Sequence, residues 1–131
     1  MKRQPPSEYD ISFDARQLTE DKRFAQRMMK AAKKREHKLY WTLAWQVRAA
    51  MLQVACGRTQ AAERQLQMAT EFLVTISGAK LSEQERAYLA PRIGKLRIWM
   101  GAVAVAVEVR KAEARQRSYR QCRHATENRS R

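Results

Sequence analysis

Hydrophobic residues are densest between Ile98 and Val109, in a stretch that leads directly into an arginine-rich C-terminus. One side of a helix would carry the apolar residues at positions 93, 96, 100, 103 and 107, and other apolar residues fill most of the remaining circumference. The alternation between Val103 and Val109 would fit a strand equally well, but strong helix formers flank it. We therefore expect a helix, with a kink or a restart at Pro91 because proline lacks the amide hydrogen.

A first helical pattern begins near Thr19, which we expect to cap the helix because two acidic residues follow it and favour the positive end of the helix dipole. Apolar residues at positions 24, 28, 31 and 32 continue this pattern. Residues 33–38 are all polar, so the helix either bends or breaks there, or continues with its charged residues outward. Residues 1–16 contain two adjacent prolines and predict an extended arm.

Two more helical patterns occupy the middle of the chain. Apolar residues return between Leu39 and Cys56, and we expect Gly57 to end this helix in the left-handed conformation. A third helix is expected from Thr59 to about Ile76, with Gly78 closing it. The linker between these two helices is short, which predicts that they are antiparallel neighbours.

Ser82 and Glu85 have the spacing of a capping box, in which the hydroxyl accepts from the third helical amide and the carboxylate accepts from the amide of the cap residue. They mark the start of the fourth helix. The sequence therefore predicts an all-α protein, a small antiparallel four-helix bundle over residues 17–118. A flexible N-terminal arm, residues 1–16, precedes it, and a basic, disordered tail, residues 119–131, follows it.

Charge is the second marked feature of the chain. Its 131 residues include 27 Lys and Arg against 13 Asp and Glu, which leaves a net charge of +14. Residues 1–38 carry 11 basic and 6 acidic side chains (+5), residues 39–91 carry 5 and 4 (+1), and residues 92–131 carry 11 and 3 (+8). Such a charge favours a polyanionic partner, nucleic acid before an anionic membrane. Antiparallel helices can bring the two basic ends together.

Nucleic-acid binding is the function that the clustered charge favours, with RNA preferred over DNA because arginine-rich segments often fold on RNA. Phosphate contacts dominate such binding, so its mechanism would be electrostatic, without base-specific readout. Tyr119 either stacks on an unpaired base or is a simple aromatic residue on the helix surface. The candidate residues are Arg27, Lys30, Lys34, Lys38, Arg110, Lys111, Arg115, Arg117, Tyr119, Arg120 and Arg123.

Apolar residues exceed what one small bundle needs to bury, since a bundle helix requires only one apolar stripe. The extra apolar residues either lie at the centre of a monomer or contact another subunit, and we favour a homo-oligomer or a subunit of a larger complex. Gly94 and Gly101 would let another helix approach closely, although single glycines are also tolerated in helices. The candidate interface residues are Trp41, Trp45, Ile98, Trp99, Ala102, Val105 and Val109.

The sequence contains no recognisable catalytic pattern. Cys122 and His124 lie close together, but two ligands do not make a zinc site, which needs three or four. There is no glycine-rich phosphate loop, nucleophile elbow or HExxH motif. We therefore expect no enzyme activity, no metal ion and no cofactor.

A few features of the sequence indicate in which cellular compartment the protein resides. The two cysteines, Cys56 and Cys122, do not form a disulfide framework, and we expect both to be reduced. The N-terminus does not have the pattern of a signal peptide. The apolar residues from Ile98 to Val109 are too few for a helix to span a bilayer core of about 30 Å. These features predict a soluble, cytoplasmic protein without a membrane partner.

Helices of this number, size and charge, with Leu81-Ser82 and then Ile93-Gly94-Lys95-Leu96-Arg97-Ile98-Trp99-Met100-Gly101, resemble the accessory variability proteins of diversity-generating retroelements over residues 39–109. Members of that family are small, basic four-helix bundles that form a ring, bind the retroelement RNA and assist its reverse transcriptase. The resemblance implies an RNA-binding accessory subunit of a ribonucleoprotein. On composition the chain is almost equally similar to the small helical subunit of CRISPR effector complexes. The remaining alternative is an interaction protein or inhibitor that binds an acidic protein.

Overall fold

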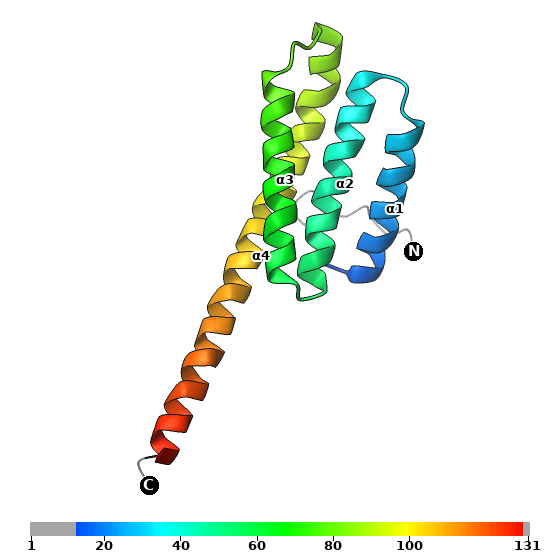
Figure 1. Ribbon diagram of the computed structural model, residues 1–131. Helices are drawn as coiled ribbons and strands as arrows, with labels where there is room; N and C mark the ends of the chain where they lie inside the picture. The colour runs from blue at the N-terminus through cyan, green and yellow to red at the C-terminus, as the bar shows by residue number, and fades with distance from the viewer. Residues whose placement is uncertain (1–12, 130–131) are drawn as a thin grey trace, which may run out of the picture.

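Four helices form the part of the chain that the computed structural model describes, residues 13–129, with side chains as far as residue 123. They are α1 (Ala15–Ala31), α2 (Arg35–Ala55), α3 (Thr59–Gly78) and α4 (Glu83–Arg129). The helices run alternately up and down and are joined by short turns (Figure 1). Residues 13–129 contain no strand, so the predicted all-α four-helix bundle is confirmed.

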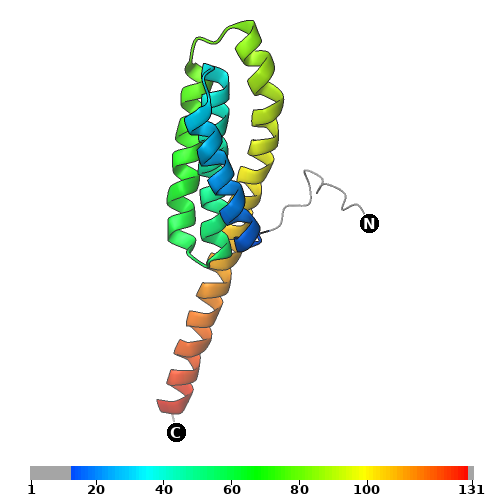
Figure 2. The same cartoon turned by 90° about the vertical axis from the view of Figure 1, so that its right-hand side faces the viewer.

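The second helix lies at the centre of the bundle. It packs against each of the other three helices, α3 also packs against α4, and α1 contacts only α2 (Figures 1 and 2). The 47 residues of α4 make it about 70 Å long at 1.5 Å per residue. Its second half therefore extends beyond the bundle, past the turn that joins α2 to α3 (Figure 1).

Apolar side chains from α2 and α4 form most of the core. Its largest fully buried side chains are Leu43, Met51, Leu89, Val47, Val54 and Val103. The apolar side of α4 faces inward as predicted, because Leu96, Met100 and Val107 are also buried and Ile93 packs against the core. Val103 to Val109 are helical, so the alternative of a strand is excluded.

The first helix begins five residues earlier than the sequence predicted. Asp14 is its N-cap, and the Asp14 Oδ1 atom accepts hydrogen bonds from the amides of Arg16 at 3.0 Å and Gln17 at 3.5 Å. The prediction of Thr19 as the cap was wrong, because Thr19 Oγ1 donates to the Ala15 carbonyl from inside the helix. Phe13 packs against the core just before the cap and fixes this earlier start.

The turns between helices follow local signals. The polar run after α1 breaks the helix, since Ala32 and Lys34 have extended backbones. Gly57 has a φ of 75° and ends α2 in the left-handed conformation, as predicted. Gly78 is instead the last residue of α3 and does not have a positive φ. Gly78 therefore closes α3 as predicted, but without the left-handed conformation that Gly57 adopts.

The fourth helix begins at the predicted capping box and continues without a restart. The Glu85 amide donates to Ser82 Oγ at 3.1 Å, and the Ser82 amide donates to Glu85 Oε1 at 3.0 Å. Pro91 lies inside the helix. Residues 119–129 continue α4 instead of forming the disordered tail that we expected, because alanine, arginine, lysine, glutamate and glutamine dominate the stretch that leads into them.

Residues 1–12 of the predicted N-terminal arm lie outside the described residues. The rest of that arm, residues 13–16, contains the cap and the first residues of α1. None of the described helices is both long enough and apolar enough to cross a membrane.

Candidate nucleic-acid interface

The first predicted basic group surrounds the turn between α1 and α2. Arg27 and Lys30 lie in the second half of α1, Lys34 precedes α2, and Lys38 is in the first turn of α2. All four side chains are exposed. The turn between α3 and α4 lies at the same end of the bundle (Figure 1).

The second predicted basic group lies on the part of α4 that leaves the bundle. Its exposed members are Arg110, Arg115, Arg117, Arg120 and Arg123. Lys111 is half-buried, and its ammonium group forms an ion pair with Glu63 of α3 and lies 3.8 Å from Glu108. This lysine therefore holds α4 against α3 where α4 leaves the bundle.

The two basic groups lie at opposite ends of the bundle and do not converge. In an up-and-down bundle, the α1–α2 turn and the α3–α4 turn share one end, whereas α4 leaves from the other end (Figure 1). The helix order already contained this information, because an even number of antiparallel helices returns the chain to the end where it began. The structure therefore separates the lysines of the first group from the arginines of the second.

A cleft of about 540 Å³ between α2 and α4 contains basic residues that the sequence analysis did not select. Arg48 of α2 lies with its guanidinium 3.5 Å from the centre of the Trp99 ring. Arg92 of α4 lies 3.8 Å from the centre of the Tyr88 ring. The cleft is lined by Tyr40, Arg48, Pro91, Arg92, Lys95, Leu96 and Trp99.

Burial changes the acid–base properties of two cleft residues. It lowers the pKa of Arg48, and the Asp21 carboxylate, 4.0 Å from the Arg48 Nε atom, acts in the opposite direction. It also raises the pKa of Tyr40. Arg48 stays charged at neutral pH, since an arginine pKa starts far above that range. The cleft thus combines cations with aromatic rings, the combination that recognises nucleotides.

A single side of α4 connects this cleft with the tail. Arg92 and Trp99 are seven residues apart, as are Arg110 and Arg117, and Trp99 precedes Arg110 by eleven. Because these separations are close to two, two and three helical turns, the four side chains share one side. This set, which we call the basic row, spans about 38 Å from Arg92 to Arg117. The spacing was readable in the sequence.

Part of the predicted tail site also lies together in the structure. A shallow depression of about 450 Å³ is lined by Arg115, Gln116, Tyr119, Arg120 and Arg123. Tyr119 is 69% exposed. The structure thus brings four of the eleven predicted nucleic-acid residues to one place on α4.

The predicted interface residues fall into two sets. Ile98, Ala102, Val105 and Val109 lie along one side of α4, and three of them are exposed large apolar side chains. The three tryptophans contact residues of their own chain: Trp41 meets the Phe24 ring edge-on, Trp45 lies under Lys22, and Trp99 lies under Arg48.

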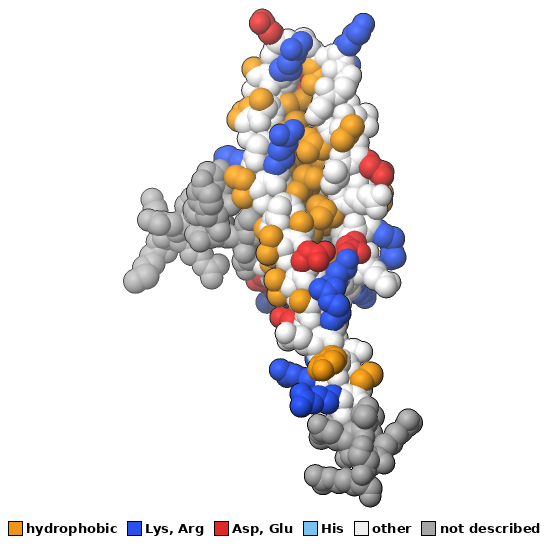
Figure 3. Space-filling model, turned by 90° about the vertical axis from the view of Figure 1, so that its left-hand side faces the viewer, with side chains coloured by type: hydrophobic (Ala, Val, Ile, Leu, Met, Phe, Trp, Pro, Cys, Tyr) orange, Lys and Arg blue, Asp and Glu red, His pale blue; other side chains and the backbone are white. Residues whose placement is uncertain are grey.

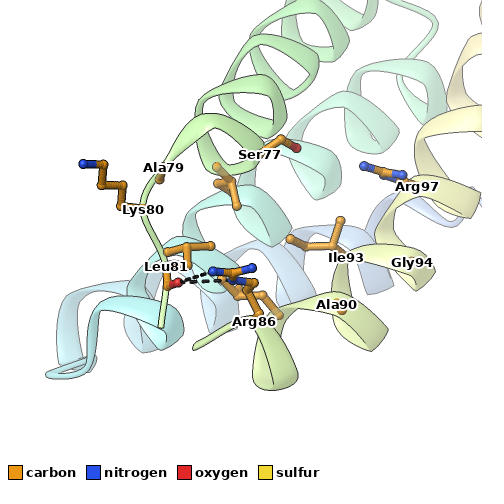
Figure 4. Close-up of a pocket in the computed structure, with 11 residues that line it drawn as sticks. Ser77, Ala79, Lys80, Leu81, Arg86, Ala90, Ile93, Gly94 and Arg97 are labelled. Atoms are coloured by element: carbon orange, nitrogen blue, oxygen red, sulfur yellow. Dashed lines mark hydrogen bonds between the residues drawn. The ribbon is translucent and has the colours of Figure 1, made fainter. Parts of the chain in front are cut away.

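A groove of about 850 Å³ lies between α3 and α4. Hydrophobic side chains gather along it on the face that these helices form (Figure 3). Ile93 and Gly94 line it from α4, and Arg97 lies at its edge (Figure 4). The Arg86 guanidinium donates to the Leu81 carbonyl at 3.0 and 3.1 Å, so it braces the α3–α4 turn.

The described residues contain no group of three or more His, Cys, Asp or Glu side chains placed to hold a metal ion. Comparison of the chain with models of protein families, with curated proteins and with solved structures gives no match.

Proposed function

We propose that this protein binds nucleic acid, with RNA favoured, along the α4 surface that carries the basic row. The observation that carries this proposal is the charge of the tail: residues 110–123 contain six basic side chains, five of them exposed, and one acidic one, on a helix that extends away from the bundle. An isolated helix with this charge has no core to stabilise it, and a polyanion would neutralise its self-repulsion.

Arginine suits this role better than lysine. Its guanidinium group forms two parallel hydrogen bonds to a phosphate and also stacks on planar rings. Tyr40 and the stacked pair Arg48–Trp99 in the cleft would offer an unpaired base a surface beside the cations Arg92 and Lys95. Unpaired bases are accessible in RNA loops and single strands, which favours RNA over duplex DNA.

The first test is binding to random-sequence RNA over a series of salt concentrations. Each neutralised phosphate releases counterions, so the logarithm of the association constant should fall steeply and linearly with the logarithm of the salt concentration. A flat dependence, or no binding in low salt, would contradict the proposal. An acidic protein would then be the better candidate partner.

Variants locate the binding surface. Replacing Arg110 and Arg117 together by glutamine should weaken RNA binding and reduce the salt slope by about 0.7 per lost phosphate contact. Arg23→Gln is the matched control, because Arg23 is an exposed arginine on α1, which does not contact α4. Charge reversal at Lys30, Lys34 and Lys38 should have a smaller effect than the Arg110 and Arg117 changes. A larger effect would move the site to the other end of the bundle.

The biological setting that we propose is a ribonucleoprotein in which this chain is a non-catalytic subunit. An accessory role beside a reverse transcriptase and a place in a CRISPR effector complex both fit a small, basic, helical RNA-binding protein. Copurification of the chain with its natural RNA, followed by sequencing of that RNA, would distinguish these settings.

A further inference from the structure

An exposed apolar stripe on α4 has the spacing of a coiled-coil seam. Ile98, Ala102, Val105, Val109 and Ala112 follow one another at intervals of four, three, four and three residues. Ile98 is 38% exposed, Val105 64% and Val109 51%, although these are large apolar side chains. The same intervals continue to Gln116 and Tyr119 on the tail. A seam with this repeat fits a partner helix of similar length.

The fourth helix itself supplies a partner of that kind. Its tail extends past the bundle (Figures 1 and 2), and the seam residues Val109 and Tyr119 are exposed there. An unsupported helix of this length is marginal in water. If a second copy ran in the opposite direction, each tail would lie along the seam of the other copy's bundle. Both the exposed seam and the projecting tail would then be covered.

We propose that two copies of this chain associate through an antiparallel coiled coil between their α4 helices. Val109 of one copy packs against Ala112 of the partner subunit, and Ala102 packs against Tyr119 of the partner subunit. Tyr119 is then a dimer contact, and this use excludes its stacking on a base. The inference does not depend on the proposed RNA binding.

The charges beside the seam select the antiparallel orientation. Glu108 and Arg115 flank the seam on one side, and Glu113 and Arg120 flank it on the other. In the antiparallel pair, Glu108 faces Arg115 of the partner subunit, and the two-fold axis repeats this ion pair. In a parallel pair, Glu108 would face Glu113 and Arg115 would face Arg120, and the two basic tails would lie side by side.

The same charges select one register of the antiparallel pair. A shift by one heptad in one direction would bring Glu108 opposite Glu108 of the partner subunit. A shift in the other direction would bring Arg115 opposite Arg115 of the partner subunit. Glu108 is available for the intersubunit pair, since its side chain is 68% exposed in the monomer.

The oligomeric state tests the seam. Sedimentation equilibrium of the full chain, purified free of nucleic acid, should give the mass of a dimer. Val105→Glu should give a monomer whose bundle stays folded, because Val105 is exposed, and its helix content by circular dichroism should fall by no more than the projecting tail contributes. Val74→Glu is the matched control: Val74 is 67% exposed on α3, lies off the seam, and its variant should remain a dimer. A monomeric wild type, or a dimeric Val105→Glu variant, would overturn the proposal.

Charge reversal tests the orientation, and the two arrangements predict opposite results. In the antiparallel dimer, Glu108→Arg or Arg115→Glu should each weaken dimerisation about tenfold, and the double variant should restore it. In a parallel dimer each single change would convert a repulsive contact into an attractive one and strengthen dimerisation. Stronger dimers from the single variants would therefore reject the antiparallel arrangement. Loss of RNA binding with the dimer intact would reject only the proposed function.

Discussion

The Glu85 carboxylate connects separate segments of the chain at one end of the bundle. Its Oε1 atom accepts from the Ser82 amide within the capping box, and both of its oxygens accept from Arg35, at 2.6 Å from Nε and 2.8 Å from Nη2. Arg35 also donates to the Lys80 carbonyl at 2.8 Å. The start of α2, the start of α4 and the turn before α4 are thus joined at one residue.

These contacts make stability depend on pH. The hydrogen bond from Arg35, and then that from the Ser82 amide, lower the pKa of Glu85 from 4.5 to about 2. Because the folded-state pKa is the lower one, the stabilisation is complete above about pH 4.5 and is lost as the pH falls through about 2. Glu85→Gln should therefore be less stable than wild type at pH 7, and the difference should close on acidification. Urea denaturation at several pH values measures this difference in the free energy of unfolding.

Glu83→Gln is the control for this measurement, because Glu83 lies in the same first turn but is exposed. The difference in unfolding free energy between the Glu83→Gln variant and wild type should not shrink in the same way below pH 4.5. A Glu85→Gln deficit of the same size at pH 2 as at pH 7 would mean that the carboxylate charge does not stabilise the fold.

Residue roles could be predicted from the sequence only where the partners are close along the chain. Ser82 and Glu85 are three residues apart, so the capping box was readable. Arg35 lies 50 residues from Glu85, and no local pattern indicates that pair. Thr19 was misread because a threonine hydroxyl also bonds to the preceding helical turn, and the local sequence does not distinguish the two uses.

At the scale of the element, α4 tolerates a proline in its interior. Pro91 has no amide hydrogen, and its ring clashes with the carbonyl four residues before it. The neighbouring Tyr88 carbonyl accepts a hydrogen bond from the Arg92 side chain at 2.8 Å. The Arg92 side chain thus adds a hydrogen bond to the helical turn that contains the proline.

Pro91→Ala should stabilise the protein by about 1–3 kcal/mol, because it restores the amide and removes the clash at an exposed site. The more flexible unfolded chain of the variant reduces the gain. The midpoint of thermal unfolding measures the effect, with Ala90→Ser as a control at an exposed neighbouring position. A destabilised Pro91→Ala variant would show that packing of α4 requires the proline.

Element boundaries were accessible from the sequence where one local signal dominated. Gly57 ends α2 by its left-handed backbone conformation. The Ser82–Glu85 capping box begins α4 by hydrogen bonds within one turn. The length of α4 was underestimated, since the basic composition of residues 119–131 was taken as a sign of disorder, whereas the helix propensity of the residues that lead into them is high.

At the scale of the whole molecule, the arrangement of the helices decides which basic residues can act together. The lysines around the α1–α2 turn and the arginines of the tail are separated by the length of the bundle (Figure 1). Arg48 of α2 lies beside Trp99 of the basic row only because α2 packs against α4. The sequence pattern did not reveal that contact. Tertiary packing was therefore the missing information about the candidate site.

The proposed dimer would also extend the surface offered to RNA. The two-fold axis of an antiparallel pair is perpendicular to the plane of its helices, so the basic rows of both copies lie on the same face. Together they span about 55 Å, compared with about 38 Å in one copy. An RNA long enough to contact both rows would gain from the effective concentration of the second row.

Breaking the dimer should therefore weaken binding of long RNA more than binding of short RNA. Val105→Glu should reduce affinity for a single strand of about 20 nucleotides by roughly tenfold or more, and should have much less effect on one of about 6 nucleotides. Fluorescence anisotropy below and above the dimer dissociation constant measures both affinities, with Val74→Glu as the control. The negative charge that the variant adds would weaken binding of the long and the short RNA alike. Equal losses of affinity for the two RNAs would therefore show that each copy binds RNA by itself.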